Sequence, residues 1–531
     1  FTATASDCVK VINERAVMVF KTSVPQDGAY QIIMKISAGD QPIHNMKVFC
    51  GRRNLIAENI NLAAHTSKHL SFITYVAPYI PAMTSIPVTE KAIYLSWCGE
   101  NASVSQISVM ETDAPVLYIA GDSTLTDQNT LYPYYPYGSC GGWAQMLAQY
   151  FPTLAICNQA HSGMTTNCFR DDGHWNIILQ HIRPKDIVML QFGHNDQKRR
   201  NLAAFGGYIN NLRRYISEIR AVGAYPIVIS PISRIPFEDN GQFRSLLSTH
   251  ALACQVVAEE CNVPFINLHE LTFRKWVSLG EPDVHDYFMD ITHTNDYGAK
   301  MIASYVVSEI QRQNITPLSA LPVSEIPQNF SPEQDTKEIP TETTAGGSFE
   351  MEIPYVDIKG IPQYDNMVEA LHLGLLDPCV MYLHPDAIMP RAQFLMVFFK
   401  ALRLSGKRPY LGCFSDLSRY EWDSSYVQAC IDENLIDPVT VSDTHFRPDD
   451  ALTAAEYASF LIRGCHTADK RDISLENCYH DAIAKGFLTD QYAPDDAINR
   501  ADCYQGLVIL MKYLHSTEQA LPSDAELHPV G

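Results

Sequence analysis

Three residues of this chain have the types and the order that nucleophilic catalysis requires. Ser123 lies in a tight polar turn directly after the apolar run 115–120. A serine hydroxyl attacks a carbonyl carbon only when a base removes its proton. His293 fits the role of that base, and Asp290, three residues earlier, fits the carboxylate that orients a catalytic histidine. Together they predict acyl transfer through a covalent intermediate on Ser123.

The chain around these residues alternates short apolar runs with amphipathic stretches. Strands are predicted at 115–120, 154–158, 186–192, 225–230 and 263–267, and helices at 205–221, 245–261 and 295–310. Such alternation predicts an α/β fold, a flavodoxin-like three-layer sandwich with a parallel sheet, over residues 114–314. Sites in such sheets form beyond the carboxyl ends of the strands, where Ser123 is expected to lie.

Four short blocks follow one another in this region. They are Gly121-Asp-Ser-Thr124, Asn158-Gln-Ala-His-Ser-Gly163, Gly193-His-Asn-Asp196 and Asp290-Ile-Thr-His293. Their order resembles the SGNH (GDSL-type) hydrolases, and they look most like the rhamnogalacturonan acetylesterase branch. The resemblance implies that the backbone N–H groups of Ser123 and Gly163 and the side-chain amide of Asn195 bind the oxyanion, since preorganised donors stabilise developing charge without reorganisation. It also implies an acetylated polysaccharide or oligosaccharide substrate and neither cofactor nor metal.

Other polar and aromatic residues near the blocks have either a structural or a substrate-binding role. We interpret Asp122, His194, His161 and His174 as structural hydrogen-bonding groups. Arg234 is either a substrate contact or part of a salt bridge at a strand end. Tyr134 and Tyr135, in the aromatic loop 131–138, either stack on a sugar ring or pack within their own loop.

Residues 1–113 alternate apolar and polar positions in short runs such as 28–37, 45–50 and 91–97. This period of two predicts β-strands, and several strands without a helix predict a β-sandwich. In position and pattern the segment looks like the galactose-binding-like sandwich that precedes some esterase domains. It is therefore either a sugar-binding module or a collar that braces the catalytic domain.

Beyond the esterase segment, residues 315–350 are rich in proline, threonine, serine and acidic residues and are predicted to be a linker. Residues 351–513 hold an internal repeat of three helical copies that resembles an S-layer homology triplet. Family copies end in a Thr-Arg-Ala-Glu-like motif, from which Pro390, Ala454 and Asn499 depart. We therefore expect the repeats to pack on the catalytic domain or on another copy of the chain rather than to bind cell walls. A chain ending near Gln313 is expected to keep the triad chemistry.

Composition narrows the class of partner. The 531 residues, 46% of them hydrophobic, suffice for about three domains. With 39 basic and 60 acidic residues the formal net charge is −21, which repels nucleic acid and anionic membrane surfaces. No apolar run approaches the roughly 18 residues of a membrane span. The 14 cysteines show no Cys-x-x-Cys spacing, so most are expected to be free thiols.

The expected location follows from the thiols and the first residues. Free thiols persist best in a reducing cytosol, and the chain opens at Phe1 without a basic and apolar leader, so a leader either was removed or never existed. A cytoplasmic location is favoured, with the bacterial cell surface or secretion as the alternative.

The function predicted from these features is a carbohydrate O-acetylesterase acting on a pectin-like, rhamnogalacturonan-like or xylan-like polysaccharide. Three alternatives remain. The first is a lipase or thioesterase of the same fold, which needs a deep apolar acyl pocket. The second is a deacetylase of N-acetyl sugars, which commonly needs a metal. The third is a non-catalytic wall-associated carbohydrate-binding protein, which does not need the intact Ser123, Asp290 and His293.

Overall fold

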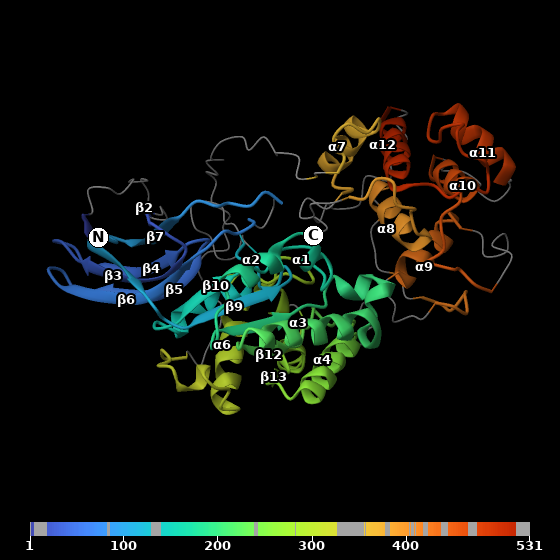
Figure 1. Cartoon of the computed structure of the whole chain (residues 1–531). Helices are drawn as coiled ribbons and strands as arrows, with labels where there is room; N and C mark the ends of the chain where they lie inside the picture. Colours follow the sequence, from blue (N-terminus) through green and yellow to red (C-terminus); the bar gives the residue numbers. More distant parts are fainter. Residues whose placement is uncertain are drawn as a thin grey trace. The chain divides into compact units, whose positions relative to one another are not determined.

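The structure is a computed structural model of the whole chain (Figure 1). It describes residues 2–4, 18–81, 85–128, 140–237, 243–281, 283–326, 355, 357–376, 383–402, 404, 408, 410–417, 423–436, 444–465 and 475–516. The chain forms two compact units, Phe1–Glu352 and Ile353–Gly531, and each is described by itself. The segments 1–113 and 114–314 both belong to the first unit.

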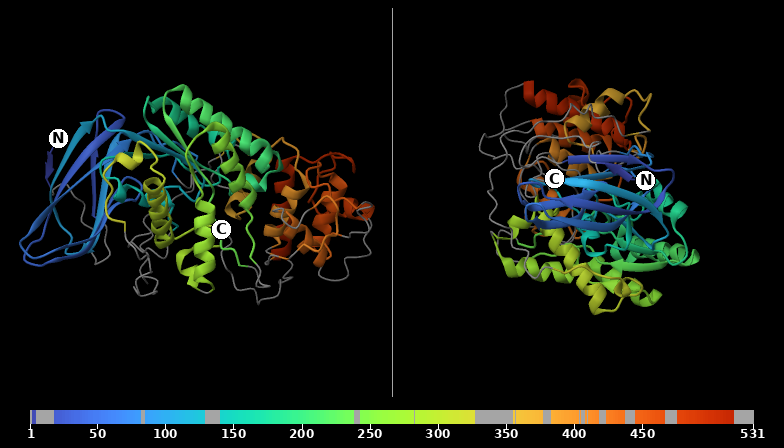
Figure 2. Two further views of the ribbon diagram at one scale, coloured as in Figure 1. Left: turned by 90° about the horizontal axis from the view of Figure 1, so that it is seen from below. Right: turned by 90° about the vertical axis from the view of Figure 1, so that its left-hand side faces the viewer.

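The described residues between 2 and 112 form two antiparallel sheets, drawn in blue in Figures 1 and 2. The strands are β1 Thr2–Thr4, β2 Met18–Ser23, β3 Gly28–Ser37, β4 Ile43–Cys50, β5 Asn54–Leu62, β6 Ser67–Val76, β7 Ala92–Glu100 and β8 Val104–Thr112. Their orders are β1-β8-β3-β6 and β2-β7-β4-β5. Ile32 and Met34 of β3 and Leu95 and Trp97 of β7 belong to one buried cluster, so both sheets share a core. Strands form at the three predicted runs, whereas the galactose-binding assignment stays a prediction.

A five-stranded parallel sheet follows, as the apolar runs predict. Its strands are β9 Val116–Gly121, β10 Ala155–Asn158, β11 Ile187–Gln191, β12 Tyr225–Ile229 and β13 Phe265–Ile266, in the order β10-β9-β11-β12-β13. All residues of β9 and β11 are buried. Central strands with helices on both faces are buried on both sides, which explains their continuous apolar sequences.

Helices cover both faces of this sheet. They are α1 Cys168–Asp171, α2 His174–His181, α3 Ile209–Ala221, α4 Ser248–Cys261, α5 Leu268–Leu279 and α6 Asp296–Arg312. Residues of α1 to α4 share one buried cluster with one face of the strands, and residues of α5 and α6 share another with the opposite face. The layers confirm the predicted α/β fold. The α-helix predicted at 205–221 begins at Ile209, after a π-helical turn at Ala204–Tyr208 in which Phe205 and Gly206 have non-helical dihedral angles.

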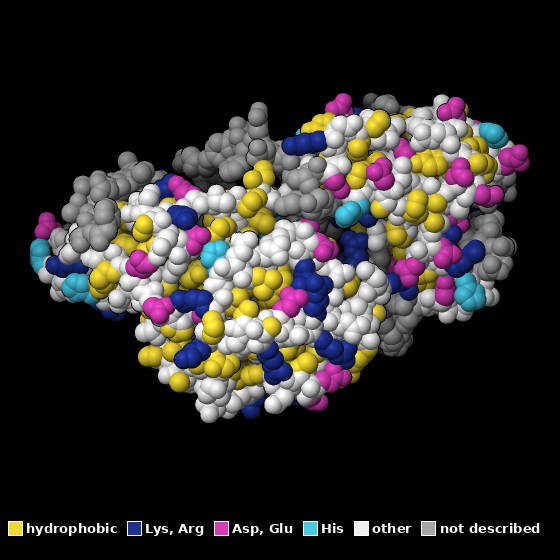
Figure 3. Space-filling model, viewed as in Figure 1, with side chains coloured by type: hydrophobic (Ala, Val, Ile, Leu, Met, Phe, Trp, Pro, Cys, Tyr) yellow, Lys and Arg dark blue, Asp and Glu magenta, His cyan; other side chains and the backbone are white. Residues whose placement is uncertain are grey.

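Charged side chains cover the surface of the first unit near α3. Figure 3 shows Lys and Arg there among Asp and Glu, and two arginines of α3 are paired, Arg213 with Glu260 and Arg214 with Glu218. Exposed ion pairs of this kind contribute at most about 1 kcal/mol each. The stability of the unit therefore rests on its buried clusters rather than on these pairs.

Residues 315–326, predicted to open the linker, belong to the first unit. Ile315 and Leu318 are buried in the same cluster as α5 and α6, and Leu321, Val323 and Ile326 pack against it. The backbone N–H of Ser324 also donates to the carbonyl of Tyr150 at 2.9 Å. Apolar residues spaced through a proline-rich stretch thus attach residues 315–326 to the first unit, and 314 is too early a boundary.

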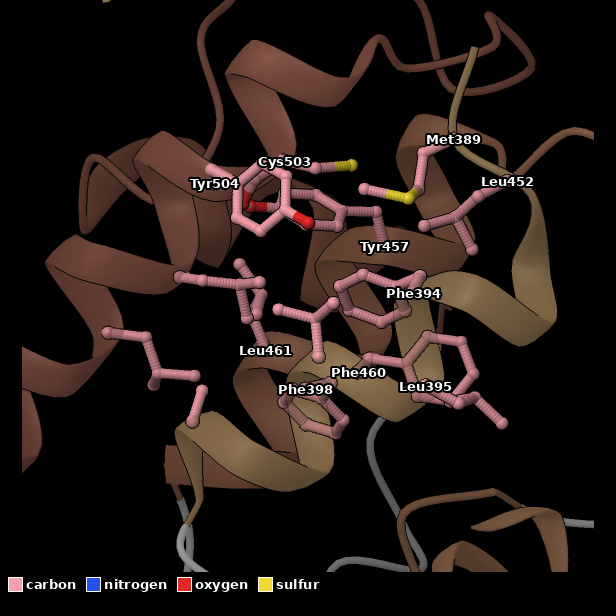
Figure 4. Close-up of a cluster of buried hydrophobic side chains, with 14 of the residues drawn as sticks. Met389, Phe394, Leu395, Phe398, Leu452, Tyr457, Phe460, Leu461, Cys503 and Tyr504 are labelled. Atoms are coloured by element: carbon pink, nitrogen blue, oxygen red, sulfur yellow. Dashed lines mark hydrogen bonds between the residues drawn. The ribbon is translucent and has the colours of Figure 1, made fainter. Parts of the chain in front are cut away.

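The described residues of the second unit form six helices. In chain order they are α7 Tyr364–His372, α8 Arg391–Ala401, α9 Ser424–Asp432, α10 Ala454–Cys465, α11 Leu475–Ala484 and α12 Arg500–Ser516. In space α7 contacts α12, α8 contacts α9, and α10 contacts α11. They share one buried cluster, and Figure 4 shows Phe394 and Phe398 of α8 beside Tyr457 and Phe460 of α10. Each predicted copy overlaps two consecutive helices, and the assignment of the segment as a three-copy repeat stays a prediction.

The three copies are joined in a ring by backbone hydrogen bonds. Met389 donates to Ile498 at 3.0 Å, Ile498 donates to Leu452 at 3.0 Å, and Leu452 donates to Met389 at 2.9 Å. The motif segments lie at the starts of the longer helices, where Thr453 and Glu456 accept from each other's backbone N–H groups as a capping box. Their relation to S-layer homology domains stays a prediction.

Two further observations concern the whole described chain. Every cysteine among the described residues is a free thiol, in line with the scattered spacing. Within the same residues, none of the helices is long and apolar enough to cross a bilayer.

Candidate active site

The structure brings Ser123, His293 and Asp290 together in one hydrogen-bonded chain. Oγ of Ser123 lies 2.9 Å from Nε2 of His293, and Nδ1 of His293 lies 2.7 Å from Oδ2 of Asp290. The serine belongs to the turn after β9, and the other two belong to the loop before α6. The His293 side chain is 26% exposed, so the ring is accessible to a substrate or a water molecule. The arrangement has the geometry of a nucleophile, a base and an orienting carboxylate.

A local turn holds the Asp290 carboxylate in place. Its Oδ1 accepts hydrogen bonds from the backbone N–H groups of Thr292 at 2.6 Å and His293 at 2.7 Å. Burial raises the pKa of this carboxyl, but the hydrogen bonds and charge of His293 outweigh burial and bring the pKa below its ordinary value. Asp290 is therefore ionised at neutral pH and accepts a proton-bearing Nδ1.

Backbone pairing and a helix cap position the loop that carries His293. The backbone N–H of Gly141 donates to the carbonyl of Thr294 at 2.8 Å, and the Thr294 hydroxyl donates to the carbonyl of Gly141 at 2.9 Å. The Asn295 side chain then accepts from the N–H groups of Tyr297 and Gly298 at the start of α6. Capping fixes where the helix begins and thus where the loop ends.

The turn after β9 is organised by the residue before the serine. Asp122 is fully buried, and its Oδ1 accepts from the backbone N–H and the hydroxyl of Thr124 at 3.0 and 2.8 Å. Its Oδ2 accepts from the backbone N–H of His194, the residue next to Asn195, at 3.3 Å. Burial raises the pKa of Asp122. The carboxyl joins the ends of β9 and β11, which is the structural role predicted for it.

Gly163 and Asn195 follow β10 and β11, the two neighbours of β9. Gly163 has φ +79°, a conformation that favours glycine. One amide hydrogen of Asn195 is donated to the carbonyl of Met164 at 3.0 Å, which fixes the orientation of the side chain. An amide nitrogen carries a second hydrogen, which suits the predicted oxyanion contact.

Glycine is also required at the start of the block that carries Asn195. Gly193 has φ +140°, and a Cβ at this position would meet Cγ of Pro231 at 2.9 Å. A larger residue would push apart the chain segments that follow β11 and β12.

The remaining predicted residues have different outcomes. Tyr134 and Tyr135 lie outside the described residues. Arg234 donates from Nη2 to the carbonyl of His194 at 3.1 Å, beside the block that carries Asn195. His194 is buried, but neither of its ring nitrogens has a hydrogen-bond partner among the described residues, so its side chain does not act as the predicted hydrogen-bonding group. Its backbone N–H and carbonyl make the contacts instead.

His161 and His174 lie behind the Gly163 turn. Both ring nitrogens of His161 face carbonyl oxygens, Ser162 at 2.9 Å and Pro81 at 2.8 Å, so both nitrogens donate only when the ring is protonated. His174 packs against this ring with centroids 4.6 Å apart. Burial lowers the pKa of His174 well below its ordinary value, and the charge of His161 lowers it further. His161 has the predicted structural role, and His174 contributes ring packing.

Sequence reasoning did not single out the turn between β4 and β5. Arg53 is buried, and its Nη1 lies 2.6 and 2.5 Å from the two carboxylate oxygens of Asp296, the first residue of α6. The two residues are 243 positions apart. The only local sequence signal is that two adjacent arginines, Arg52 and Arg53, lie in a short turn between two strands.

No group of three or more His, Cys, Asp or Glu side chains among the described residues is arranged to hold a metal ion.

Residues 119–301 match the model of the GDSL-like lipase/acylhydrolase family. A probable rhamnogalacturonan acetylesterase of Bacillus subtilis (strain 168), YesY, is 32% identical over 209 residues, which are 37% of this chain and 92% of that protein. The chain belongs to the GDSL-like lipase/acylhydrolase family. As a member of this family it is a serine carboxylic ester hydrolase.

Other similar proteins share the esterase part. The rhamnogalacturonan acetylesterase RhgT of Bacillus subtilis (strain 168) is 29% identical over 212 residues, 37% of this chain and 89% of that protein. The crystal structure of Axe2, an acetylxylan esterase from Geobacillus stearothermophilus, is 18% identical with a TM-score of 0.28, over 37% of this chain and 94% of that one. The family match over residues 119–301 and the similarity to YesY confirm the resemblance to SGNH (GDSL-type) hydrolases for the hydrolase segment.

Proposed function

We propose that this esterase removes O-acetyl groups from a plant-type polysaccharide, pectin-like, rhamnogalacturonan-like or xylan-like. The observation that carries the proposal is the hydrogen-bonded chain from Ser123 through His293 to Asp290 beside the ends of the parallel strands. The names of the similar proteins, two rhamnogalacturonan acetylesterases and an acetylxylan esterase, support the choice of an acetylated carbohydrate.

The first half of the reaction transfers the acetyl group to the enzyme. Oγ of Ser123 attacks the acetyl carbonyl carbon while Nε2 of His293 takes the hydroxyl proton. The tetrahedral intermediate places its negative charge on the former carbonyl oxygen, which accepts from the N–H groups of Ser123 and Gly163 and from the amide of Asn195. The bond between the acetyl carbon and the sugar oxygen then breaks, and His293 gives its proton to the leaving sugar hydroxyl.

The second half restores the serine. His293 takes a proton from a water molecule, whose oxygen attacks the acyl carbon, and the same donors stabilise the second tetrahedral intermediate. The bond to Oγ of Ser123 breaks, Oγ regains a proton from His293, and acetate leaves. The Asp290 carboxylate stabilises the imidazolium in both halves through its contact with Nδ1.

Acetate release from acetylated rhamnogalacturonan, xylan and mannan tests the proposal. We expect release from at least one of the first two, and no release by Ser123→Ala, which should remain folded because it only removes one hydroxyl. Faster hydrolysis of an octanoyl ester or a thioester than of every acetylated polysaccharide would instead identify a lipase or thioesterase.

A further inference from the structure

The turn between β4 and β5 brings two arginines from the N-terminal sheets to the loops of the candidate active site. Gly51 and Arg53 both have positive φ, +59° and +61°, so the chain reverses tightly there. Positive φ is uncommon for a residue other than glycine and persists where surrounding contacts determine the conformation. Arg53 is 7% exposed, and the contacts of its side chain hold the backbone in this conformation.

Arg53 joins the base side of the site to the nucleophile side. On the base side, Nη1 binds both carboxylate oxygens of Asp296, and Nη2 donates to the carbonyl of Cys140 at 2.8 Å. Cys140 in turn pairs through its backbone with Asn295, the cap of α6. Two anchor points of the loop that carries His293 therefore contact a single guanidinium group.

On the nucleophile side, Nε of Arg53 donates to the carbonyl of Gln128 at 3.4 Å. The Gln128 side chain donates to the carbonyl of Ser123 at 2.9 Å, and Gln145 also donates to the carbonyl of Gln128 at 3.0 Å. One arginine thus touches the segment that follows Ser123 as well as the segment that follows His293. The planar guanidinium has five N–H donors in a fixed arrangement, which suits it to this bridging.

The adjacent Arg52 acts on the third side. It lies 3.1 Å from the Asp127 carboxylate, stacks over Tyr79 at 4.3 Å, and donates to the carbonyl of Asn158 at the end of β10. Asn158 opens the block that leads to Gly163. The same turn therefore contacts the segment after β9, the end of β10 and the start of α6, next to the residues that carry Ser123, Gly163 and His293.

We propose that Arg53 is a positioning residue for the esterase reaction, setting the place of the His293 loop relative to Ser123. This inference rests on the proposed function of the triad. The N-terminal sheets then complete the active site from outside the hydrolase segment. Reaction rates are sensitive to small displacements, because a misplacement of about 1 Å can lower a rate by about 10²-fold.

The test compares Arg53→Met with Lys300→Met in the full chain. Lys300 binds Glu58 at 3.0 Å and, like Arg53, joins the N-terminal sheets to α6, but it touches neither loop of the triad. The measured quantity is kcat for p-nitrophenyl acetate per active site, counted by the burst of p-nitrophenol. We expect Arg53→Met to lower kcat by about 10²-fold with little change in KM, Arg53→Lys to recover part of the loss, and Lys300→Met to keep the wild-type kcat.

Each outcome decides the question. Wild-type kcat in Arg53→Met, or an equal loss in Lys300→Met, would show that the turn only braces the fold. If Arg53→Met does not fold, Arg53→Met/Asp296→Leu replaces both charges by apolar groups, a change that is often tolerated; wild-type kcat in that variant would overturn the proposal. Activity remaining in Ser123→Ala would refute the proposed function itself, whereas an inactive Ser123→Ala beside a fully active Arg53→Met refutes only this inference.

Discussion

Replacing Asp290 by asparagine should remove most of the activity although the two side chains have nearly the same shape. Oδ1 of Asp290 accepts from two backbone N–H groups, at 2.6 and 2.7 Å, and Oδ2 accepts from Nδ1 of His293 at 2.7 Å. An amide NH2 group cannot accept hydrogen bonds, so it is excluded from the position of Oδ1. In Asp290→Asn the amide nitrogen must therefore face Nδ1.

This orientation reverses the tautomer of the base. The amide donates to Nδ1, so the ring proton moves to Nε2, which lies 2.9 Å from Oγ of Ser123. A protonated Nε2 cannot take the serine proton. We expect kcat to fall by about 10⁴-fold, the usual loss for a triad in the wrong tautomer. That factor corresponds to about 5.4 kcal/mol of transition-state stabilisation.

The assay is p-nitrophenyl acetate hydrolysis, with thermal unfolding of the same samples. Asp113→Asn is the matched control, because Asp113 is 92% exposed and bonds only to a surface arginine, Arg183. It should keep the wild-type kcat. A loss below about tenfold in Asp290→Asn, or a change confined to KM, would refute the assignment of Asp290 as the group that orients the base.

Three further predictions follow from the site and its boundaries. Asn195→Ala should lower kcat by about 10²–10³-fold, the usual loss for one oxyanion donor, and an effect on KM alone would contradict this role. Burial raises the pKa of Asp196 to about 7, so the folded chain holds a proton that the unfolded chain releases above about pH 4. The resulting stability is present below about pH 4 and is lost as the pH rises to about 7. The free energy of unfolding of Asp196→Asn, measured with denaturant, should therefore fall less than that of wild type between pH 5 and pH 8. Parallel plots of unfolding free energy against pH for the two proteins would argue against it. A chain ending at Ile326 should keep its activity. A chain ending at Gln313 loses the burial of Ile315 and Leu318, which lowers its free energy of unfolding by about 3–6 kcal/mol. Equal melting temperatures of the two chains would refute this difference.

Local patterns in the sequence predict the strands of the parallel sheet and the contact between Asp290 and His293. The apolar run that ends at Gly121 forms β9 because a strand between two helical layers is buried on both faces. Asp290 and His293 are three residues apart, so a single turn brings the carboxylate to the ring, and sequence spacing already contains that geometry. Only the pairing with Ser123, 170 residues away, depends on the fold.

The contacts that sequence reasoning missed depend on distant partners. Arg53 precedes Asp296 by 243 residues, and neither residue has a local pattern that announces a buried ion pair. The sequence predicts a hydrogen-bonding role for the side chain of His194, yet the fold buries both ring nitrogens without a partner among the described residues. Residues 315–326 have the composition of a linker, yet their apolar side chains belong to or pack against the buried cluster of α5 and α6, and the N–H of Ser324 bonds to Tyr150.

The closed ring in the second unit limits how this part of the chain can vary. In an open stack of repeats, copies can be added or lost at the ends, provided that a capping copy covers each end. Here the bonds among Met389, Leu452 and Ile498 return to their starting point, so no copy is terminal. Deleting one copy breaks two of the three hydrogen-bonded links. A fourth copy would find no unpaired edge of the ring to bind. The number of copies is set by closure, and we expect all three to fold and unfold as a single cooperative body.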